Sequence, residues 1–286
     1  MKKQISYLLQ VFLQKLQQSR TFTLMILEMY ILYIYTQPVI KFSEASSYPS
    51  AVWTLPFMFS NIYFLFLFML GVIYYFSDVP FMQHFSMYQI IRTGRKRWVL
   101  GQIGSVILQS GFLMIFNFAM SILWLFGHCE WTTGWGKLLH TAALTNAADY
   151  YGFLFEVPYS AMQKYSPIEL VLMTLVIGTL VISFIGILMF ALSLVLGRIW
   201  AIAAAVVMVV MIYLVHNAHP AGVQKLSMFA PVTWMQTTMI GTKMYSYYTR
   251  PPLEYMIFAL LVGILLLGCF IFWRVRYVEF LFTNED

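Results

Sequence analysis

Six long apolar stretches limit what this chain can fold into. They run near residues 21–40, 54–77, 98–127, 167–196, 199–217 and 253–274. A helix needs about 20 predominantly apolar residues to cross the hydrocarbon core of a membrane, and each stretch is of that order or longer. The composition agrees, because 61% of the residues are hydrophobic and only 10% are charged, against about 25% charged in a soluble domain. The sequence therefore predicts an all-α membrane protein with six transmembrane helices.

The borders of the fourth and fifth stretches carry clear helix signals. Ser166-Pro167-Ile168-Glu169 has the serine, the proline and the glutamate of a capping box that begins a helix. Only Gly197-Arg198 separates the fourth stretch from the fifth. We therefore expect these two helices to be antiparallel neighbours. The third and fourth stretches, at about 30 residues each, are long enough to tilt or to project from the bilayer.

The N-terminal residues 1–20 precede the first apolar stretch and have a different pattern. Apolar residues recur at helical spacing, and polar residues fill the other side: Ile5, Leu8, Leu9, Phe12, Leu13 and Leu16 against Gln4, Gln10, Gln14, Lys15, Gln17 and Gln18. This pattern predicts an amphipathic helix that lies at the membrane interface and is too polar to span it. A soluble helix packed on a partner is the alternative. Residues 21–286 then form a single transmembrane domain.

The distribution of lysine and arginine predicts the orientation of the six helices. If the N-terminus is cytoplasmic, one face holds Lys2, Lys3, Lys15, Arg20, Arg92, Arg95, Lys96, Arg97, Arg198, Arg274 and Arg276. The opposite face then holds Lys41, Lys137, Lys164, Lys225, Lys243 and Arg250, spread over longer loops. Because cytoplasmic loops are enriched in lysine and arginine, we expect both termini to be cytoplasmic. The net charge of +6 then reflects topology, and we expect no nucleic-acid partner.

Two of the expected external loops are long and aromatic. Residues 128–166 contain two tryptophans, and residues 218–252 contain Pro231, Trp234 and a cluster of tyrosines. Amphipathic, aromatic loops of this kind are typical of short helices that lie on the outer leaflet or enter it. The first external connection, 41–53, is short.

One cytoplasmic stretch, residues 78–97, is both polar and strongly basic. Asp78 and Pro80 have the pattern of a helix N-terminus, and Thr93-Gly94 that of a helix end. We therefore expect a helix of about three turns here. Its candidate docking residues are Asp78, Phe81, Met82, Phe85, Tyr88, Arg92, Arg95, Lys96 and Arg97. The cations either anchor the loop to the anionic leaflet or flank a helix that receives a cytoplasmic partner, and both roles are compatible.

A few polar residues within the apolar stretches are candidates for a substrate path. Glu28 lies in the first stretch, where an ionisable group is costly and has to face protein or water. It contacts substrate or a proton, or else pairs with a hydroxyl or an amide such as Asn61 or Asn117; the structural pairing is our preferred interpretation. Tyr35 shares its helical face.

No arrangement of residues predicts catalysis or a metal site. Gly94-Arg95-Lys96-Arg97 lacks the rest of a phosphate-binding loop, so we expect the chain not to be an enzyme. His128, Cys129, Glu130 and His140, and the pair His216 and His219, include metal-binding residue types but match no established site. Interfacial histidines are the preferred interpretation. Cys129 and Cys269 are expected at different depths, so they should not form a disulfide.

The whole chain resembles the membrane subunits of ABC-2 type ABC transporters. The shared features are the amphipathic N-terminal helix, six spans with both ends inside, Arg92-Thr93-Gly94-Arg95 after a cytoplasmic helix, and the segment Ala230-Pro231-Val232-Thr233-Trp234 after the fifth span. The long loop 128–166 departs from the compact family pattern. The resemblance implies a coupling helix at about 79–91 and a homo- or heterodimer of permease subunits. It also implies ATPase subunits on separate chains, which bind the ATP and Mg, in a bacterial plasma membrane.

These expectations together predict a permease subunit of an ATP-driven exporter. The 19 methionines and 25 phenylalanines would make an adaptable, apolar wall, suited to an antimicrobial peptide, a drug or a lipid. No cofactor is expected on this chain. The alternatives are an ion-coupled secondary transporter, which works alone, and a membrane scaffold or sensor that binds a signalling protein.

Overall fold

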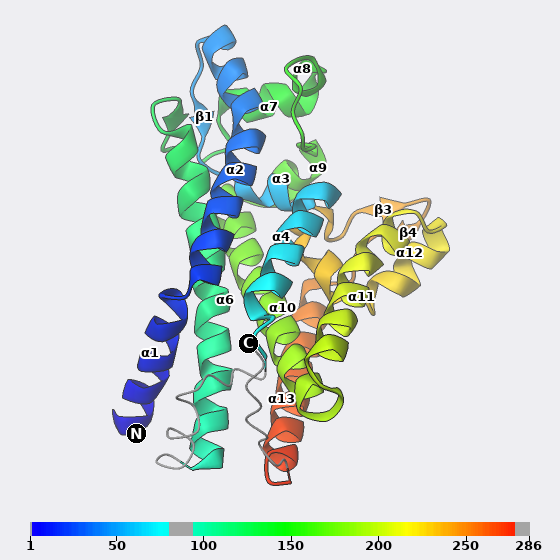
Figure 1. Cartoon of the computed structure of the whole chain (residues 1–286). Coiled ribbons are helices and arrows are strands. Elements are labelled where there is room, and N and C mark those ends of the chain that lie inside the picture. The colour runs from blue at the N-terminus through cyan, green and yellow to red at the C-terminus, as the bar shows by residue number, and fades with distance from the viewer. Residues whose placement is uncertain (1, 80–93, 278–286) are drawn as a thin grey trace.

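The computed structural model describes residues 2–79 and 94–277, and these residues form a helical bundle (Figure 1). Its long helices are α1 (Lys2–Leu16), α2 (Ser19–Ser46), α4 (Ile62–Phe76), α6 (Arg95–Leu125), α10 (Pro167–Leu196), α11 (Arg198–His216) and α13 (Leu253–Arg274). The short helices are α3 (Leu55–Ser60), α7 (Gly136–Leu144), α8 (Ala147–Tyr150), α9 (Tyr159–Lys164), α12 (Pro220–Ser227), η1 (Pro231–Met235) and η2 (Thr237–Met239). Two pairs of two-residue strands complete the described part: β1 (Ser50–Ala51) with β2 (Cys129–Glu130), and β3 (Lys243–Met244) with β4 (Tyr247–Tyr248).

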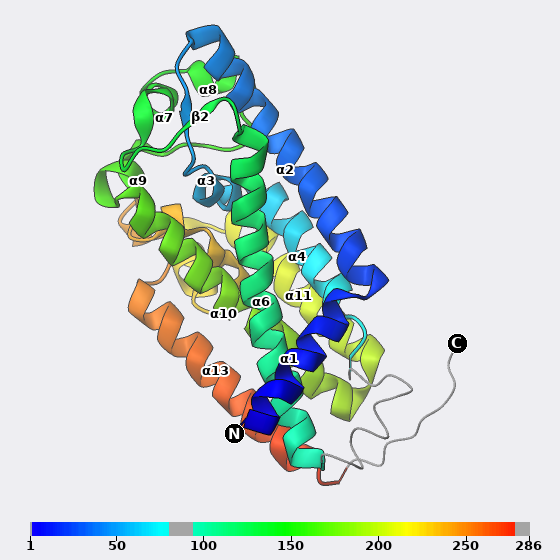
Figure 2. The same cartoon turned by 90° about the vertical axis from the view of Figure 1, so that its left-hand side faces the viewer.

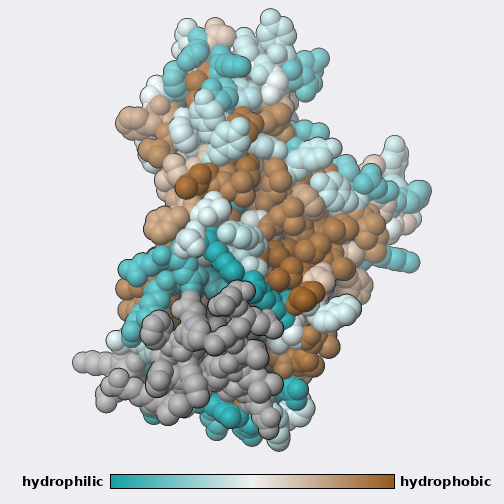
Figure 3. All heavy atoms as spheres, viewed as in Figure 1, coloured by the Kyte–Doolittle hydropathy of each residue, from teal (hydrophilic) through white to brown (hydrophobic). Residues whose placement is uncertain are grey.

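Five of these helices are long and apolar enough to cross a membrane: α2, α6, α10, α11 and α13. The chain is therefore an all-α protein with the helices of a multi-pass membrane protein. Apolar side chains cover the face formed by α4 and α11, whereas hydrophilic residues gather at the upper end (Figure 3). The tight turn expected between α10 and α11 is present at Gly197, whose φ of 88° suits glycine.

The second apolar stretch does not form the continuous helix expected over 54–77. It is divided into α3 and α4 by Asn61, whose backbone is extended (φ −73°, ψ 131°). The Asn61 side chain accepts a hydrogen bond from the backbone N–H of Phe64 at 3.0 Å and so begins α4 as an N-cap. At 15 residues, α4 is about 22 Å long and is shorter than a membrane core.

Helix α10 lies at the centre of the bundle and packs against α4, α6, α11 and α13. Glycines allow the closest approaches. A Cβ atom at Gly186 would lie 2.8 Å from Val106 Cγ1 and 3.2 Å from the Phe76 ring, and one at Gly178 would lie 2.4 Å from Met114. Phe76, Val106 and Gly186 therefore mark one level of the bundle.

The upper end of the bundle is a small folded cap above α6 and α10. It holds β1, β2 and α7–α9, beside the upper part of α2 (Figures 1 and 2). The indole of Trp135 is buried and donates hydrogen bonds to the carbonyls of Met162 and Tyr165, both at 3.2 Å. Short helices were expected in both long loops and are present in both.

The lower end is uneven, because α4 ends well above the helices around it (Figure 1). From the level of Phe76, α6 continues down to Arg95 and α10 continues down to Leu196. At 1.5 Å per residue, this places the end of α4 about 15 Å above the lower ends of α6 and α10. The last residues of α4 therefore lie in a recess between longer helices.

Helix α1 is amphipathic, as expected, and lies along the lower half of α6 (Figure 2). Gly101 and Gly104 of α6 make room for Tyr7 and Leu8, and the rings of Phe12 and Phe112 meet edge to face at 6.1 Å. Its other face leaves an apolar row exposed: Ile5, Leu9 and Leu13. The helix ends at Leu16, so Arg20 already belongs to α2.

Candidate functional site

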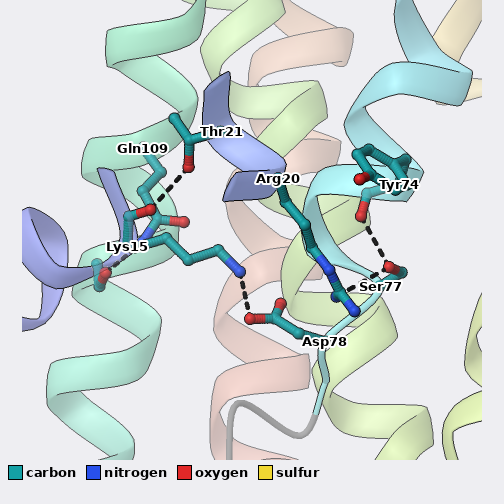
Figure 4. A network of polar contacts seen from close by, with 8 residues as sticks. Lys15, Arg20, Thr21, Tyr74, Ser77, Asp78 and Gln109 are labelled. Carbon is teal, nitrogen blue, oxygen red and sulfur yellow. Dashed lines mark hydrogen bonds and ion pairs between the residues drawn. The ribbon is translucent and has the colours of Figure 1, made fainter. Parts of the chain in front are cut away.

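Charged and polar side chains from α1, α2 and the end of α4 meet in the recess (Figure 4). The Lys15 ammonium group donates a hydrogen bond to Asp78 Oδ2 and lies 5.1 Å from the centre of the Tyr75 ring. Arg20 Nη1 donates to Ser77 Oγ at 3.2 Å. We call Lys15, Arg20, Ser77 and Asp78 the polar junction. It connects α1 and the start of α2 to the point where the chain leaves α4.

Local hydrogen bonds hold the two sides of the polar junction in place. The Thr21 hydroxyl donates to the Lys15 carbonyl at 2.7 Å across the corner between α1 and α2. This corner brings Lys15 and Arg20 to the same side. The Ser77 hydroxyl donates to the Tyr74 carbonyl at 2.7 Å and so closes the last turn of α4.

The ion pair of the polar junction is largely removed from solvent. The exposed fractions of the Lys15 and Asp78 side chains are 7% and 20%. Burial lowers the pKa of Lys15 from its usual value, and the Asp78 carboxylate opposes this shift. Because a charge removed from water has a high desolvation cost, each member of such a pair depends on the other.

Three basic residues of the predicted docking set, Arg95, Lys96 and Arg97, lie at the start of α6. Arg95 Nη1 donates to the backbone carbonyls of Val275 at 3.2 Å and Arg276 at 3.0 Å, which ties this start to the end of α13. A cavity of about 560 Å³ is lined here by Gly94, Arg95, Lys96, Arg97 and Arg276. Asp78, by contrast, belongs to the polar junction, which lies in the recess above the lower end of α6. The expected coupling helix (79–91), with Phe81, Met82, Phe85, Tyr88 and Arg92, lies almost wholly outside the described residues.

The four residues expected on a substrate path do not form one cluster. Tyr35 Oη donates to Asn61 Oδ1 at 2.9 Å, and Asn61 Nδ2 donates to the Leu154 carbonyl at 2.7 Å. Asn61 thus links α2, the break before α4 and the upper cap. Asn117 Nδ2 instead donates within its own helix, to the Leu113 carbonyl at 2.9 Å.

Glu28 is fully buried, and the expected pairing with Asn61 or Asn117 is wrong. Its carboxylate lies against Gly71 of α4, where an added Cβ would be 3.1 Å from Oε1. Neither oxygen has a hydrogen-bond partner within residues 2–79 and 94–277. A buried carboxyl group without a partner is costly, and in a membrane protein it is by default a functional candidate.

We expect Glu28→Met to raise the free energy of unfolding by about 1–3 kcal/mol, because it removes an unpartnered buried polar group and keeps a similar shape. Detergent-denaturant titration of the purified protein measures this change. Glu254→Met, at an exposed position on the first turn of α13, is the control and should change stability by less than about 0.5 kcal/mol. A loss of stability in Glu28→Met would mean that the carboxyl group makes a compensating interaction.

A second buried polar network, centred on Arg250, was missed by sequence reasoning. The Arg250 guanidinium donates to the Thr233 carbonyl at 3.2 Å, to the Thr249 carbonyl at 2.6 Å and to Gln236 Oε1. Gln236 Nε2 in turn donates to the Ser60 carbonyl at 2.8 Å, at the end of α3. Burial lowers the pKa of Arg250 to about 10. The sequence shows Arg250 only as one loop cation, with no periodic signal for its burial.

The histidine and cysteine candidates lie at separate places in the fold. Within the described ranges, no group of three or more ligand-type residues converges. His128 Nε2 lies 3.7 Å from Glu44 Oε1 at an exposed position. Cys129 and Cys269 are both free, which confirms that they do not pair.

Comparisons with protein-family models, with curated proteins and with solved structures found no match. The function is therefore argued from the geometry of the chain. Two arrangements are candidates for a functional site. One is the polar junction with the basic cluster below it, and the other is the buried carboxyl group of Glu28.

Proposed function

We propose that this chain is the membrane-spanning permease subunit of an ATP-driven exporter of the ABC-2 type. In this proposal the chain crosses a bacterial plasma membrane six times with both termini cytoplasmic, and α3 and α4 together make the second crossing. The observation that supports it best is the way both ends of the connection 80–93 are anchored. The connection leaves α4 at the polar junction and enters α6 at the cluster tied to α13.

Anchoring of this kind suits a connection that transmits force. A push on residues 80–93 would reach α1 through the Lys15–Asp78 ion pair and α13 through Arg95. These helices would then change their tilt as units, which is how small displacements become rigid-body rearrangements. Partner binding can shift the equilibrium between two such arrangements only if it favours one of them.

The proposal requires partners that supply energy and complete the pathway. A separate ATPase, which binds the ATP and Mg, would dock on the basic face around Arg95, Lys96 and Arg97. A second permease subunit, of the same or another chain, would complete the dimer. The apolar composition favours an amphipathic substrate such as a peptide, a drug or a lipid.

Co-purification from the native membrane tests this proposal. We expect an ATPase with a phosphate-binding loop to accompany the chain, and Lys96→Glu with Arg97→Glu to reduce the amount recovered by about tenfold or more, because each reversal replaces attraction by repulsion. Lys225→Glu, an exposed lysine on α12 at the upper side, is the matched control and should leave recovery unchanged. Recovery of the chain without any ATPase would contradict the proposal.

An ion-coupled secondary transporter is the second candidate, and the burial of Glu28 without a partner favours it. Such a carrier would move its substrate after reconstitution without an ATPase, driven by a pH gradient. Glu28→Gln would then abolish flux. In the ATP-driven exporter, the same variant would leave ATP-dependent flux in place.

A further inference from the structure

A cavity of about 330 Å³ opens near the upper end of the bundle, where the break in the second stretch faces the end of α11. Its walls come from four separate parts of the chain, including the 151–158 segment of the long upper loop. The lining residues are Ser60, Asn61, Ile62, Glu156, Pro158, His216, Thr238, Met239, Thr242 and Thr249. Its volume is within the range of small-molecule sites, about 300–1,000 Å³.

The hydroxyl groups of this cavity present oxygen lone pairs. Thr242 Oγ1 and Thr249 Oγ1 share a hydrogen bond at 2.6 Å, and one of them donates to the Met239 carbonyl, which lies 2.7 Å from Thr242 Oγ1 and 3.0 Å from Thr249 Oγ1. Ser60 Oγ donates to the Pro56 carbonyl at 3.0 Å and shares a hydrogen bond with Thr238. Because these hydroxyl protons are used within the protein, the oxygens are left to accept from a ligand.

The charges around the cavity favour a cation. Glu156 is exposed on its wall, and no described residue forms an ion pair or hydrogen bond with its carboxylate. His216, on the rim, is the last residue of the 19-residue helix α11. The carbonyl end of a helix carries partial negative charge, so cations are stabilised there. Discontinuous membrane helices place such ends at cation sites.

Two cations lie behind the cavity but do not line it. Arg250 directs its donors to the carbonyls of Thr233 and Thr249 and to Gln236. Lys164 Nζ donates to the Ile240 carbonyl at 3.2 Å. Both charges are therefore engaged by oxygen atoms of the protein, and an anion in the cavity would meet the Glu156 carboxylate.

We propose that this cavity binds the ammonium group of an amphipathic amine. Glu156 and the threonine hydroxyls accept hydrogen bonds from the ammonium group, while Ile62, Pro158 and Met239 contact the apolar part. The amine is either a soluble molecule or the ethanolamine headgroup of a lipid. Binding requires no ATPase, so the inference stands apart from the proposed export function.

Calorimetric titration of 2-phenylethylammonium into the full chain, held in phosphatidylglycerol nanodiscs, tests the proposal. We expect one amine per chain, bound at least about tenfold more tightly than uncharged 2-phenylethanol. Glu156→Gln should weaken amine binding about tenfold or more, since it removes a charge-assisted hydrogen bond. The control Glu254→Gln replaces an exposed glutamate away from the cavity and should leave the affinity unchanged.

His216→Lys provides a second, independent variant at an exposed position. It adds a positive charge at the rim and should weaken amine binding. Equal binding of amine and alcohol, or an unchanged affinity in both Glu156→Gln and His216→Lys, would overturn the proposal. Adding phosphatidylethanolamine to the nanodiscs distinguishes a soluble amine from a lipid headgroup as the natural occupant. Loss of bound 2-phenylethylammonium would identify the lipid headgroup as the occupant, and its retention would identify a soluble amine; either result supports the site.

Discussion

Replacing Arg250 by methionine is expected to lower the free energy of unfolding by about 3–5 kcal/mol. Arg250 is 6% exposed, and its guanidinium holds together three acceptors from separate positions of the 233–249 segment. Methionine fills similar space but leaves those acceptors buried without donors, and each such loss costs about 1–3 kcal/mol. The linked Gln236 would also lose its fixed orientation toward the Ser60 carbonyl.

Unfolding in mixed micelles of increasing denaturing-detergent fraction measures this loss. Arg250→Lys should recover only part of it, because an ammonium group cannot reproduce the planar fork of donors. The control is Arg198→Met, which changes the exposed first residue of α11 and should stay within about 0.5 kcal/mol of the wild type. If Arg250→Met were as stable as Arg198→Met, the network would not hold this segment in place.

The long helices were predictable because their borders carry local signals. Helix α10 runs from Pro167 to Leu196, as expected, and its capping box between Ser166 and Glu169 is present. Helix α13 also has its expected bounds, and α11 differs by one residue at each end. Capping and the conformational freedom of Gly197 act within a few residues, so sequence alone reveals them.

The break at Asn61 was missed because hydropathy does not detect backbone geometry. Both sides of the break are apolar, and a window over 54–77 averages across it. Ser60-Asn61 within this run is the one available signal, since asparagine is a good N-cap. Its structural role depends on Tyr35 and on the Leu154 carbonyl, which are distant in the sequence.

The polar junction was not predictable because its depth depends on packing. From sequence, Asp78 is a capping residue for a helix beyond α4. In the folded chain, the break at Asn61 means that α4 begins only at Ile62. The contact between Phe76 and Gly186 of α10 fixes the level at which α4 ends. Asp78 therefore reaches Lys15 of α1, a residue that the sequence places on the polar side of an interfacial helix.

The Lys15–Asp78 ion pair should show the signature of a buried pair. We expect Lys15→Met to lower the free energy of unfolding by about 3 kcal/mol, because it leaves the Asp78 carboxylate largely buried and unpaired. Asp78→Asn should have a similar effect, since it leaves the Lys15 ammonium group without its counter-charge. Both are measured by the same denaturing-detergent titration.

The double variant Lys15→Met with Asp78→Leu separates the cost of an orphaned charge from the value of the pair. Replacing both members of a buried pair by apolar residues is often neutral or stabilising, so we expect most of the lost stability to return. The exposed pair of Glu44 and His128 provides a control, and Glu44→Gln should change stability by less than about 0.5 kcal/mol. Additive losses in the double variant would show that Lys15 and Asp78 act independently, and the junction would then be no mechanical link between α1 and the end of α4.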